Sequence, residues 1–272
     1  MQKITLANGH ALDLVGTGTN TFGKINHEYT QGLSNDLSDM AYAIQAGYRL
    51  FDTAVSYRTE PIVGQGLANS ALARDQFFIT TKFPGRDDDP KDRQNEARIR
   101  QIIDQSFANL QTDRIDLYLL HHPWKNHEDI LRVWRVLESY VNAGRINSLG
   151  VSNYDQELLE FLMAHARIQP VLNQIESHPG RWNDDLIVFT QAKGLVAQAW
   201  GPLTNVAETS RDALSEIGQK YGKSWAQVAL KYNVQRQVAV IPKSHQLCHQ
   251  EANLDIFDFT LSAEDLAHIQ KL

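Results

Sequence analysis

Apolar residues follow two alternating patterns along this chain of 272 residues. Short continuous apolar runs predict buried strands, whereas apolar residues that recur every three or four positions predict amphipathic helices. The strand-like runs cover residues 50–51, 77–81, 115–120, 149–151, 171–175, 195–199 and 238–242, after a first run that ends before Gly16. The helical patterns cover residues 37–44, 60–73, 99–110, 130–141, 158–164 and 186–192, two stretches between 210 and 235, and a last helix that opens at Ser262 with Asp265 as its capping-box partner.

This alternation predicts an α/β fold. Eight strands, each followed by helix, in a chain of this length are typical of a (β/α)8 TIM barrel, and we expect residues 1–272 to form a single domain. Two short apolar runs flank Asn8-Gly9, a strong turn signal, so an N-terminal β-hairpin is predicted before the barrel. A doubly wound open sheet is the alternative, but nothing divides the pattern into two halves.

Polar residues stand directly after these strand-like runs. They are Asp52, Lys82, His121, Ser152, Asn153, Gln174, Trp200 and Lys243, with Tyr57 just beyond Asp52. In a barrel, the carboxyl ends of all strands share one face, where active sites lie. We therefore expect these side chains to form one site.

Composition excludes several classes of function. The net charge is −6 and no basic stripe occurs, so nucleic acid is not an expected partner. The start of the chain does not resemble a signal peptide, and no apolar run approaches the roughly 18 residues that a membrane helix needs. Cys248 is the only cysteine, which excludes an internal disulfide. We expect a cytoplasmic protein that acts on small molecules as a monomer.

The first strand ends in a pair of glycines, Gly16 and Gly18, that could indicate a dinucleotide-type phosphate loop. That fingerprint needs a third glycine where Thr21 stands, so a tight passage with close backbone approach is the better interpretation. The acidic stretch 86–90 is interpreted as a polar turn rather than a cation site.

Four of the strand-end groups suit proton transfer to an oxygen. A lysine ammonium about 4 Å from a tyrosine contributes roughly 4 kcal/mol at an effective dielectric near 20, so Lys82 is expected to lower the pKa of Tyr57. Asp52 would keep Lys82 charged, and His121 could orient a carbonyl oxygen. This set lacks a source of hydride, which a cofactor must supply.

Some of these residues have other interpretations. Asp52 and Lys82 could be only a buried ion pair. His121 and His122 could be metal ligands, but no carboxylate or cysteine stands at a supporting spacing, so no metal site is expected. Trp200 would ordinarily be core packing, but its place at a strand end favours stacking on a ring.

The same residues resemble the aldo-keto reductase superfamily over essentially the whole chain. The matching segments are Gly47-Tyr48-Arg49-Leu50-Phe51-Asp52-Thr53-Ala54 with Tyr57, Ile79-Thr80-Thr81-Lys82, Leu117-Tyr118-Leu119-Leu120-His121-His122-Pro123, Gly150-Val151-Ser152-Asn153-Tyr154, Asn173-Gln174-Ile175-Glu176, Ala199-Trp200-Gly201-Pro202-Leu203 and Ile241-Pro242-Lys243-Ser244. The most similar subgroup is that of short bacterial reductases such as 2,5-diketo-D-gluconate reductase. The resemblance implies reversible, metal-independent, NADPH-dependent reduction of aldehydes and ketones.

The resemblance also implies roles for individual residues. Asp52, Tyr57, Lys82 and His121 would be the catalytic tetrad, with Tyr57 as the proton donor. The implied cofactor contacts are Ser152, Asn153 and Gln174 with the nicotinamide carboxamide, Trp200 with its ring, Lys243 and Ser244 with the 2′-phosphate side, Asn253 with adenine, and also Gly18, Thr19, Gly201, Leu203 and His249.

Three departures from the family pattern carry expectations of their own. His249 replaces an arginine that grips the 2′-phosphate, and Ala252 replaces a glutamate near the adenine, so NADH should be accepted beside NADPH. His122 and Asn20 replace frequent aromatic residues, which indicates a pocket for small polar carbonyls. The short C-terminus indicates an open site, with Phe22, Phe83 and Trp124 as candidate walls.

Two further functions stay open at this point. The family includes cofactor-binding regulatory subunits and lens structural proteins, although an intact tetrad favours an enzyme. A barrel aldolase that uses Lys82 as a Schiff-base nucleophile would need a neutral lysine, which Asp52 opposes.

Overall fold

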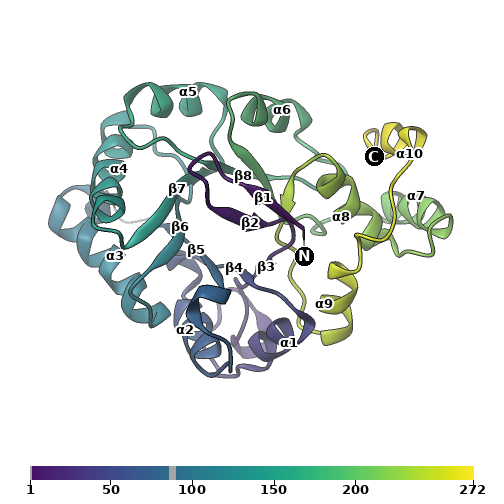
Figure 1. Cartoon of the computed structure of the whole chain (residues 1–272), viewed down its shortest axis with the longest axis horizontal. Coiled ribbons are helices and arrows are strands. Elements are labelled where there is room, and N and C mark those ends of the chain that lie inside the picture. The colour runs from purple at the N-terminus through teal and green to yellow at the C-terminus, as the bar shows by residue number, and fades with distance from the viewer. Residues whose placement is uncertain (1, 86–89) are drawn as a thin grey trace.

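The computed structural model describes residues 2–85 and 90–272, and eight parallel strands form its main sheet (Figure 1). These strands are β3 (Thr17–Gly18), β4 (Leu50–Asp52), β5 (Phe78–Phe83), β6 (Ile115–Leu120), β7 (Ile146–Ser152), β8 (Leu172–Glu176), β9 (Val196–Trp200) and β10 (Ala239–Val240), and they pair in chain order. The helices that surround them are α1 (Ser38–Ala46), α2 (Glu60–Ala68), α3 (Glu96–Leu110), α4 (His127–Asn142), α5 (Gln156–His165), α6 (Asp184–Ala192), α7 (Glu208–Gln219), α8 (Trp225–Gln235), α9 (Leu247–Leu254) and α10 (Ala263–Ile269). Short 3-10 helices are η1 (Ile25–His27), η2 (Val55–Tyr57), η3 (Arg74–Gln76) and η4 (Pro90–Arg93).

The sheet closes on itself between its first and last strands. Val15 forms a parallel bridge with Val240, and the Gly16 N–H donates to the Val240 carbonyl at 2.8 Å. A closed ring of parallel strands leaves no open edge, so the predicted (β/α)8 barrel is confirmed and the open sheet is excluded. A Cβ at Gly16 would lie 2.5 Å from the Leu50 side chain, which explains why a glycine stands in this passage.

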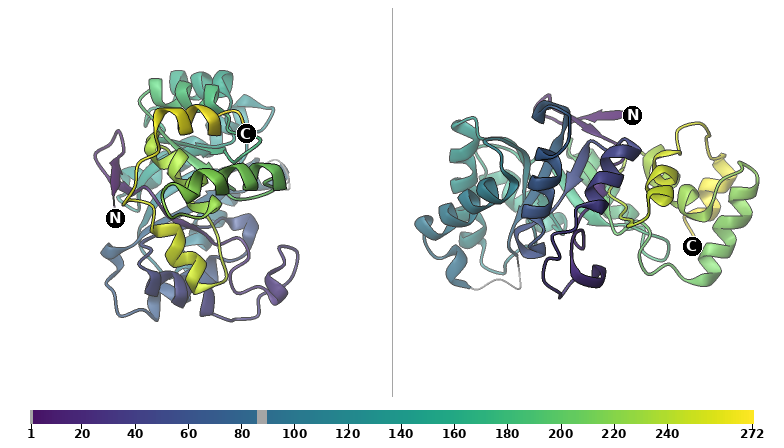
Figure 2. Two further views of the ribbon diagram at one scale, coloured as in Figure 1. Left: turned by 90° about the vertical axis from the view of Figure 1, so that its right-hand side faces the viewer. Right: turned by 90° about the horizontal axis from the view of Figure 1, so that it is seen from below.

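The predicted N-terminal hairpin is present and covers one end of the barrel (Figures 1 and 2). Strands β1 (Lys3–Thr5) and β2 (Ala11–Asp13) pair antiparallel around Gly9, whose φ of 90° requires the left-handed conformation. The Asn8 side-chain amide donates to the Asn147 carbonyl and the Ser148 hydroxyl near the start of β7. The hairpin therefore covers the amino-terminal ends of the strands and leaves the opposite end for the site.

The predicted helices differ from the structure in several details. Helix α2 ends at Ala68 instead of continuing to residue 73, because the Ser70 hydroxyl bonds back to the Leu67 carbonyl and the chain turns there. The sequence pattern also missed α9, which has an apolar face too short to show helical periodicity clearly. At the last helix, the Ser262 hydroxyl accepts the Asp265 N–H, as expected of a capping residue. The Asp265 carboxylate, however, accepts from that same hydroxyl and not from the Ser262 backbone N–H, as a full capping box would require.

Most apolar residues pack in one core, formed by the barrel interior and the layer between strands and helices. A second, smaller cluster lies beneath α7, α8 and α10, where the Trp182 indole N–H donates to the Ile269 carbonyl. Among the described residues, no helix combines the length and the apolar character needed to cross a bilayer. The turn expected at 86–90 lies largely outside the described residues.

Candidate active site

Three neighbouring strands bring the predicted tetrad together at the carboxyl end of the barrel. Asp52 is the last residue of β4, Lys82 lies near the end of β5, and His121 directly follows β6. Tyr57 ends η2, the helical turn that follows Asp52. Because parallel strands finish at the same face, residues separated by up to 69 positions become neighbours here.

Lys82 and Asp52 form a buried ion pair at the centre of this group. The Lys82 ammonium donates to Asp52 Oδ1, to the Thr53 carbonyl at 2.9 Å and to the Tyr57 hydroxyl at 3.5 Å. Both side chains are almost fully shielded from solvent. Burial lowers the pKa of Lys82 and raises that of Asp52, and the attraction within the pair opposes both shifts. The ion pair expected from the sequence is thus present, with burial as the larger influence on each pKa.

Tyr57 lies between the ion pair and His121. Its hydroxyl is 3.4 Å from His121 Nε2, and the two rings meet edge to face with centroids 5.3 Å apart. Burial raises the pKa of Tyr57 well above its ordinary value, and the negative charge of Asp52 adds to the rise. This direction is opposite to the lowering expected from Lys82. The physical reason is that burial penalises the phenolate, while Asp52 sets a negative charge beside the Lys82 cation.

A glutamine pair supports Asp52 from within the barrel. Gln174 Nε2 donates to Asp52 Oδ2 at 2.8 Å and to Gln198 Oε1 at 2.7 Å. Gln198 is fully buried in β9, two residues before Trp200. Gln198 was not predicted to belong to the site. Residues two positions apart on a strand point to the same face, so its place two residues before Trp200 indicated that both side chains share the inner face of the strand. The pair fixes the second carboxylate oxygen, which leaves the first for Lys82.

A cavity of about 550 Å³ opens beside the tetrad at this end of the barrel. The predicted site residues on its wall are Gly18, Thr19, Asn20, Asp52, Tyr57, His121, His122, Ser152, Asn153, Gln174, Trp200, Gly201, Leu203 and Lys243. The wall also includes Tyr29, Pro202, Thr204, Ile241 and Pro242, which the sequence analysis did not identify. Tyr29 lies on the loop after η1, and its ring meets that of Tyr57 edge to face with centroids 6.1 Å apart. Its loop position gave no periodic signal from which to predict this contact.

The remaining predicted residues lie away from that cavity. Phe22, Phe83 and Trp124 are buried, and Phe83 packs edge to face against Trp124, so the cavity does not support their role as walls. Ser244, His249 and Asn253 lie beyond Lys243, on the β10–α9 loop and on α9. His249 is exposed, and Asn253 is buried beside the Tyr48 hydroxyl.

Residues predicted to hold a nicotinamide form a connected hydrogen-bond network. Asn153 adopts a left-handed backbone with φ of 62°, which turns its side chain back toward the strand ends. Its amide donates to the His121 carbonyl and to Ser152 Oγ, and its Oδ1 accepts the Trp200 indole N–H at 2.9 Å. The indole of Trp200 is thereby fixed at the edge of the cavity.

The donor set fits a nicotinamide cofactor. The wall offers an indole face, together with neutral amides and hydroxyls, for a nicotinamide ring and its carboxamide. Lys243 on the same wall offers a cation for a phosphate. Asn20 Oδ1 on the same wall is buried without a protein partner, so it needs a hydrogen-bond donor from a bound molecule or water. A Schiff-base role for Lys82 fits poorly, because its amine is fully buried and engaged with three oxygens.

Comparison with known proteins places this geometry in context. The sequence pattern described as "Aldo/keto reductase family" matches residues 14–272. A glyoxal reductase of Bacillus subtilis is 38% identical over 231 residues, which cover 85% of this chain and 80% of that protein. The crystal structure of an aldo/keto reductase from Brucella melitensis superposes with a TM-score of 0.88 at 33% identity, covering 99% of this chain and 98% of the other.

A further solved structure adds information on the cofactor. An aldo-keto reductase of Bombyx mori, crystallised in complex with NADP, superposes with a TM-score of 0.86 at 29% identity and covers 99% of this chain and 92% of the other. The resemblance found in the sequence is confirmed by these matches. The family pattern extends over nearly the whole chain, and the chain therefore belongs to the aldo/keto reductase family of oxidoreductases.

Proposed function

We propose that this protein reduces small polar aldehydes and ketones to alcohols with NADPH, and that Tyr57 is the proton donor. The observation that carries the proposal is the convergence of Tyr57, His121 and the Lys82–Asp52 pair at one cavity. The Tyr57 hydroxyl lies 3.5 Å from Lys82 Nζ and 3.4 Å from His121 Nε2. A carbonyl oxygen in the cavity would meet two groups able to donate a hydrogen bond at that point.

The nicotinamide supplies the hydride when it is bound, and Ser152, Asn153, Gln174 and Trp200 are the residues that would hold it. The chain's own groups deal with the oxygen. The Tyr57 hydroxyl donates its proton to the carbonyl oxygen as negative charge develops there, and the O–H bond of Tyr57 breaks. The resulting phenolate faces the Lys82 ammonium, which stabilises it. His121 orients the carbonyl oxygen toward Tyr57.

The raised pKa of Tyr57 agrees with this role. The tyrosine is neutral at physiological pH and so holds the proton that the reduction consumes. An alkoxide is a far stronger base than a phenolate, so transfer from tyrosine to the nascent alcohol remains favourable. The pKa rises because burial penalises the phenolate and Asp52 adds a negative charge nearby, and together these outweigh the attraction of the Lys82 ammonium.

Small polar carbonyls are the proposed substrates because polar groups surround the tetrad. Asn20, Tyr29 and His122 share the cavity wall with Tyr57. The relative named glyoxal reductase supports a small dicarbonyl as the first substrate to test. We also propose that NADH is accepted, since His249 offers no bidentate fork for a 2′-phosphate.

The test is a spectrophotometric screen of glyoxal, methylglyoxal, small hydroxyaldehydes and bulky aromatic aldehydes, with NADPH and NADH in parallel. Tyr57→Phe is the matched control, because it keeps the ring and removes the proton. We expect its kcat to fall by at least a hundredfold with cofactor binding retained. Turnover unchanged in Tyr57→Phe would refute the donor assignment, and faster turnover of the bulky aldehydes would refute the substrate class. Cofactor binding without oxidation across the whole screen would favour a regulatory protein.

A further inference from the structure

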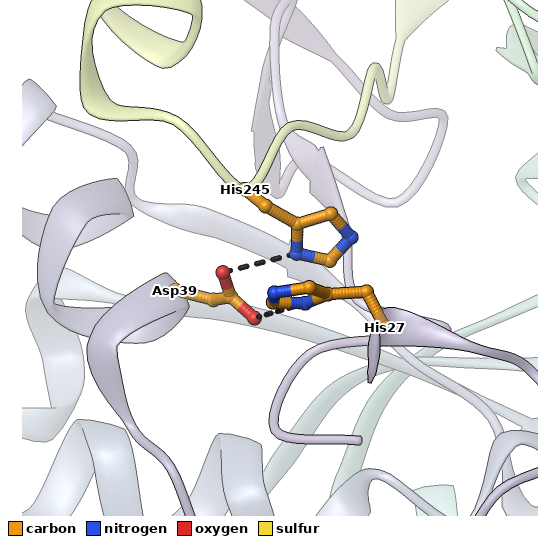
Figure 3. Close-up of side chains that lie close together, drawn as sticks. All are labelled: His27, Asp39 and His245. Carbon is orange, nitrogen blue, oxygen red and sulfur yellow. Dashed lines mark hydrogen bonds and ion pairs between the residues drawn. The ribbon is translucent and has the colours of Figure 1, made fainter. Parts of the chain in front are cut away.

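Two histidines and an aspartate from three separate segments meet beside the cavity (Figure 3). His27 belongs to η1, Asp39 to the first turn of α1, and His245 to the loop between β10 and α9. One ligand atom from each residue lies within 4.8 Å of the others. Asp39 and His245 are 206 positions apart, so no spacing in the sequence could reveal this cluster.

The distances within the cluster are close to those of a small metal site. His245 Nδ1 lies 3.0 Å from Asp39 Oδ1, and His27 Nδ1 lies 3.6 Å from Asp39 Oδ2. Tetrahedral Zn²⁺ with ligands at about 2.0–2.1 Å places neighbouring ligand atoms about 3.3 Å apart. The two measured separations involve different oxygens of the carboxylate, and the three ligand atoms lie within 4.8 Å of one another, so the side chains would close around an ion that contacts all three residues.

The surroundings are those of a metal ligand set. Metal-bound histidines use one ring nitrogen for the metal and donate the other to a fixed acceptor. His245 offers such a pair of contacts, because its Nε2 lies 3.0 Å from the Thr21 hydroxyl, which could accept from it, while its Nδ1 faces Asp39. Asp39 is fixed in turn by the Gly23 N–H at 3.3 Å. Figure 3 shows the two imidazoles one above the other and the Asp39 carboxylate beside them, with one oxygen facing each ring.

Charge at this position also favours a cation. The Asp39 side chain is 5% exposed, and among the described residues it forms ion-pair contacts with the two histidines. A second acid, Asp36, lies near His27. Lys243 is the opposing cation, and its ammonium is held by the Thr21 hydroxyl at 2.8 Å.

We propose that His27, Asp39 and His245 bind a divalent transition-metal ion, with Zn²⁺ as the natural occupant. Two imidazoles and one carboxylate leave the fourth tetrahedral position to water. The ion would join the β3–α1 loop to the β10–α9 loop, next to the wall residue Lys243. It takes no part in the proposed proton transfer, although it shares the Thr21 hydroxyl with Lys243, a proposed cofactor contact.

The experiment uses untagged full-length protein stripped with a chelator and then titrated with Co²⁺ and with Zn²⁺. We expect one equivalent of Co²⁺ to give visible d–d absorption, Zn²⁺ to displace it, and Zn²⁺ to raise the Tm. Asp39→Asn and His245→Ala should each weaken binding by at least tenfold. His10→Ala, at an exposed histidine of the N-terminal hairpin, is the matched control and should bind as the wild type does.

The outcomes separate the proposal from its alternatives. No binding by the stripped wild-type protein would overturn it, as would binding that survives in both variants, since the ion would then lie elsewhere. Far-UV circular dichroism and the Tm without metal verify that each variant is folded. If one variant is unfolded, the other still decides the question, because the two residues lie on different segments.

Discussion

Replacing Lys82 by methionine tests the central electrostatic argument. The change removes the ammonium that contacts Asp52, the Thr53 carbonyl and the Tyr57 hydroxyl, and it fills the same volume with an apolar chain. Asp52, whose pKa burial already raises, is expected to take up a proton when its counter-charge is lost. The Gln174 amide still donates to the second carboxyl oxygen.

The effect on catalysis follows from the 3.5 Å between Lys82 Nζ and the Tyr57 hydroxyl. At an effective dielectric near 20, an ammonium attracts a phenolate at that distance by about 5 kcal/mol. The Asp52 carboxylate cancels part of this attraction, so about 2–4 kcal/mol remains as net stabilisation of the phenolate. We therefore expect kcat for carbonyl reduction to fall by about 30- to 1,000-fold.

The assay is NADPH oxidation with glyoxal, measured in the steady state and in single turnover, with cofactor binding followed by fluorescence. Lys82→Met alone breaks a buried ion pair, a change that typically costs about 3–5 kcal/mol of stability, so unfolding by denaturant is measured as well. The double variant Asp52→Asn/Lys82→Met removes both charges and should recover part of the stability without recovering activity. A folded Lys82→Met enzyme that keeps more than a tenth of the wild-type kcat would refute the reasoning.

Three further predictions follow. Because burial raises the pKa of Tyr57, its hydroxyl keeps its proton through neutral pH. The rate of carbonyl reduction should therefore stay level between about pH 6 and 9 and decline only as pH rises toward that pKa, whereas the rate of alcohol oxidation should increase with pH. A reduction rate that already falls between about pH 7 and 8 would contradict this. His249→Arg should increase the preference for NADPH over NADH in kcat/KM by about tenfold, since it restores a bidentate phosphate ligand, and an unchanged ratio would place the 2′-phosphate elsewhere. Burial alone would raise the pKa of Asp265, but hydrogen bonds from Lys220, Tyr221 and Ser262 outweigh it and lower the pKa to about 2, so the stability that the carboxylate contributes is present above about pH 4 and disappears as pH falls toward 2. Asp265→Asn should therefore cost about 1 kcal/mol of stability at pH 7, after allowance for solvent around Lys220, and an equal cost at pH 2 would refute the linkage.

The sequence by itself determined the architecture and the position of the site. Buried strands and amphipathic helices leave periodic patterns because each must turn an apolar face to the core, and this local requirement is visible without coordinates. The polar residues that end these strands were visible for the same reason, since they interrupt runs that burial keeps apolar. Asp52, Lys82 and His121 were therefore found from the pattern, and their meeting followed from the parallel sheet.

Only the tertiary structure decided the interactions that depend on distance in space. Closure of the barrel rests on Val15 and Val240 meeting across the whole chain. The pKa of Tyr57 is raised because its hydroxyl is buried and lies near the Asp52 carboxylate. The size of neither effect can be obtained from the order of the residues. Tyr29 and the cluster of His27, Asp39 and His245 gave no sequence signal, because side chains from different segments become neighbours only when the whole chain packs.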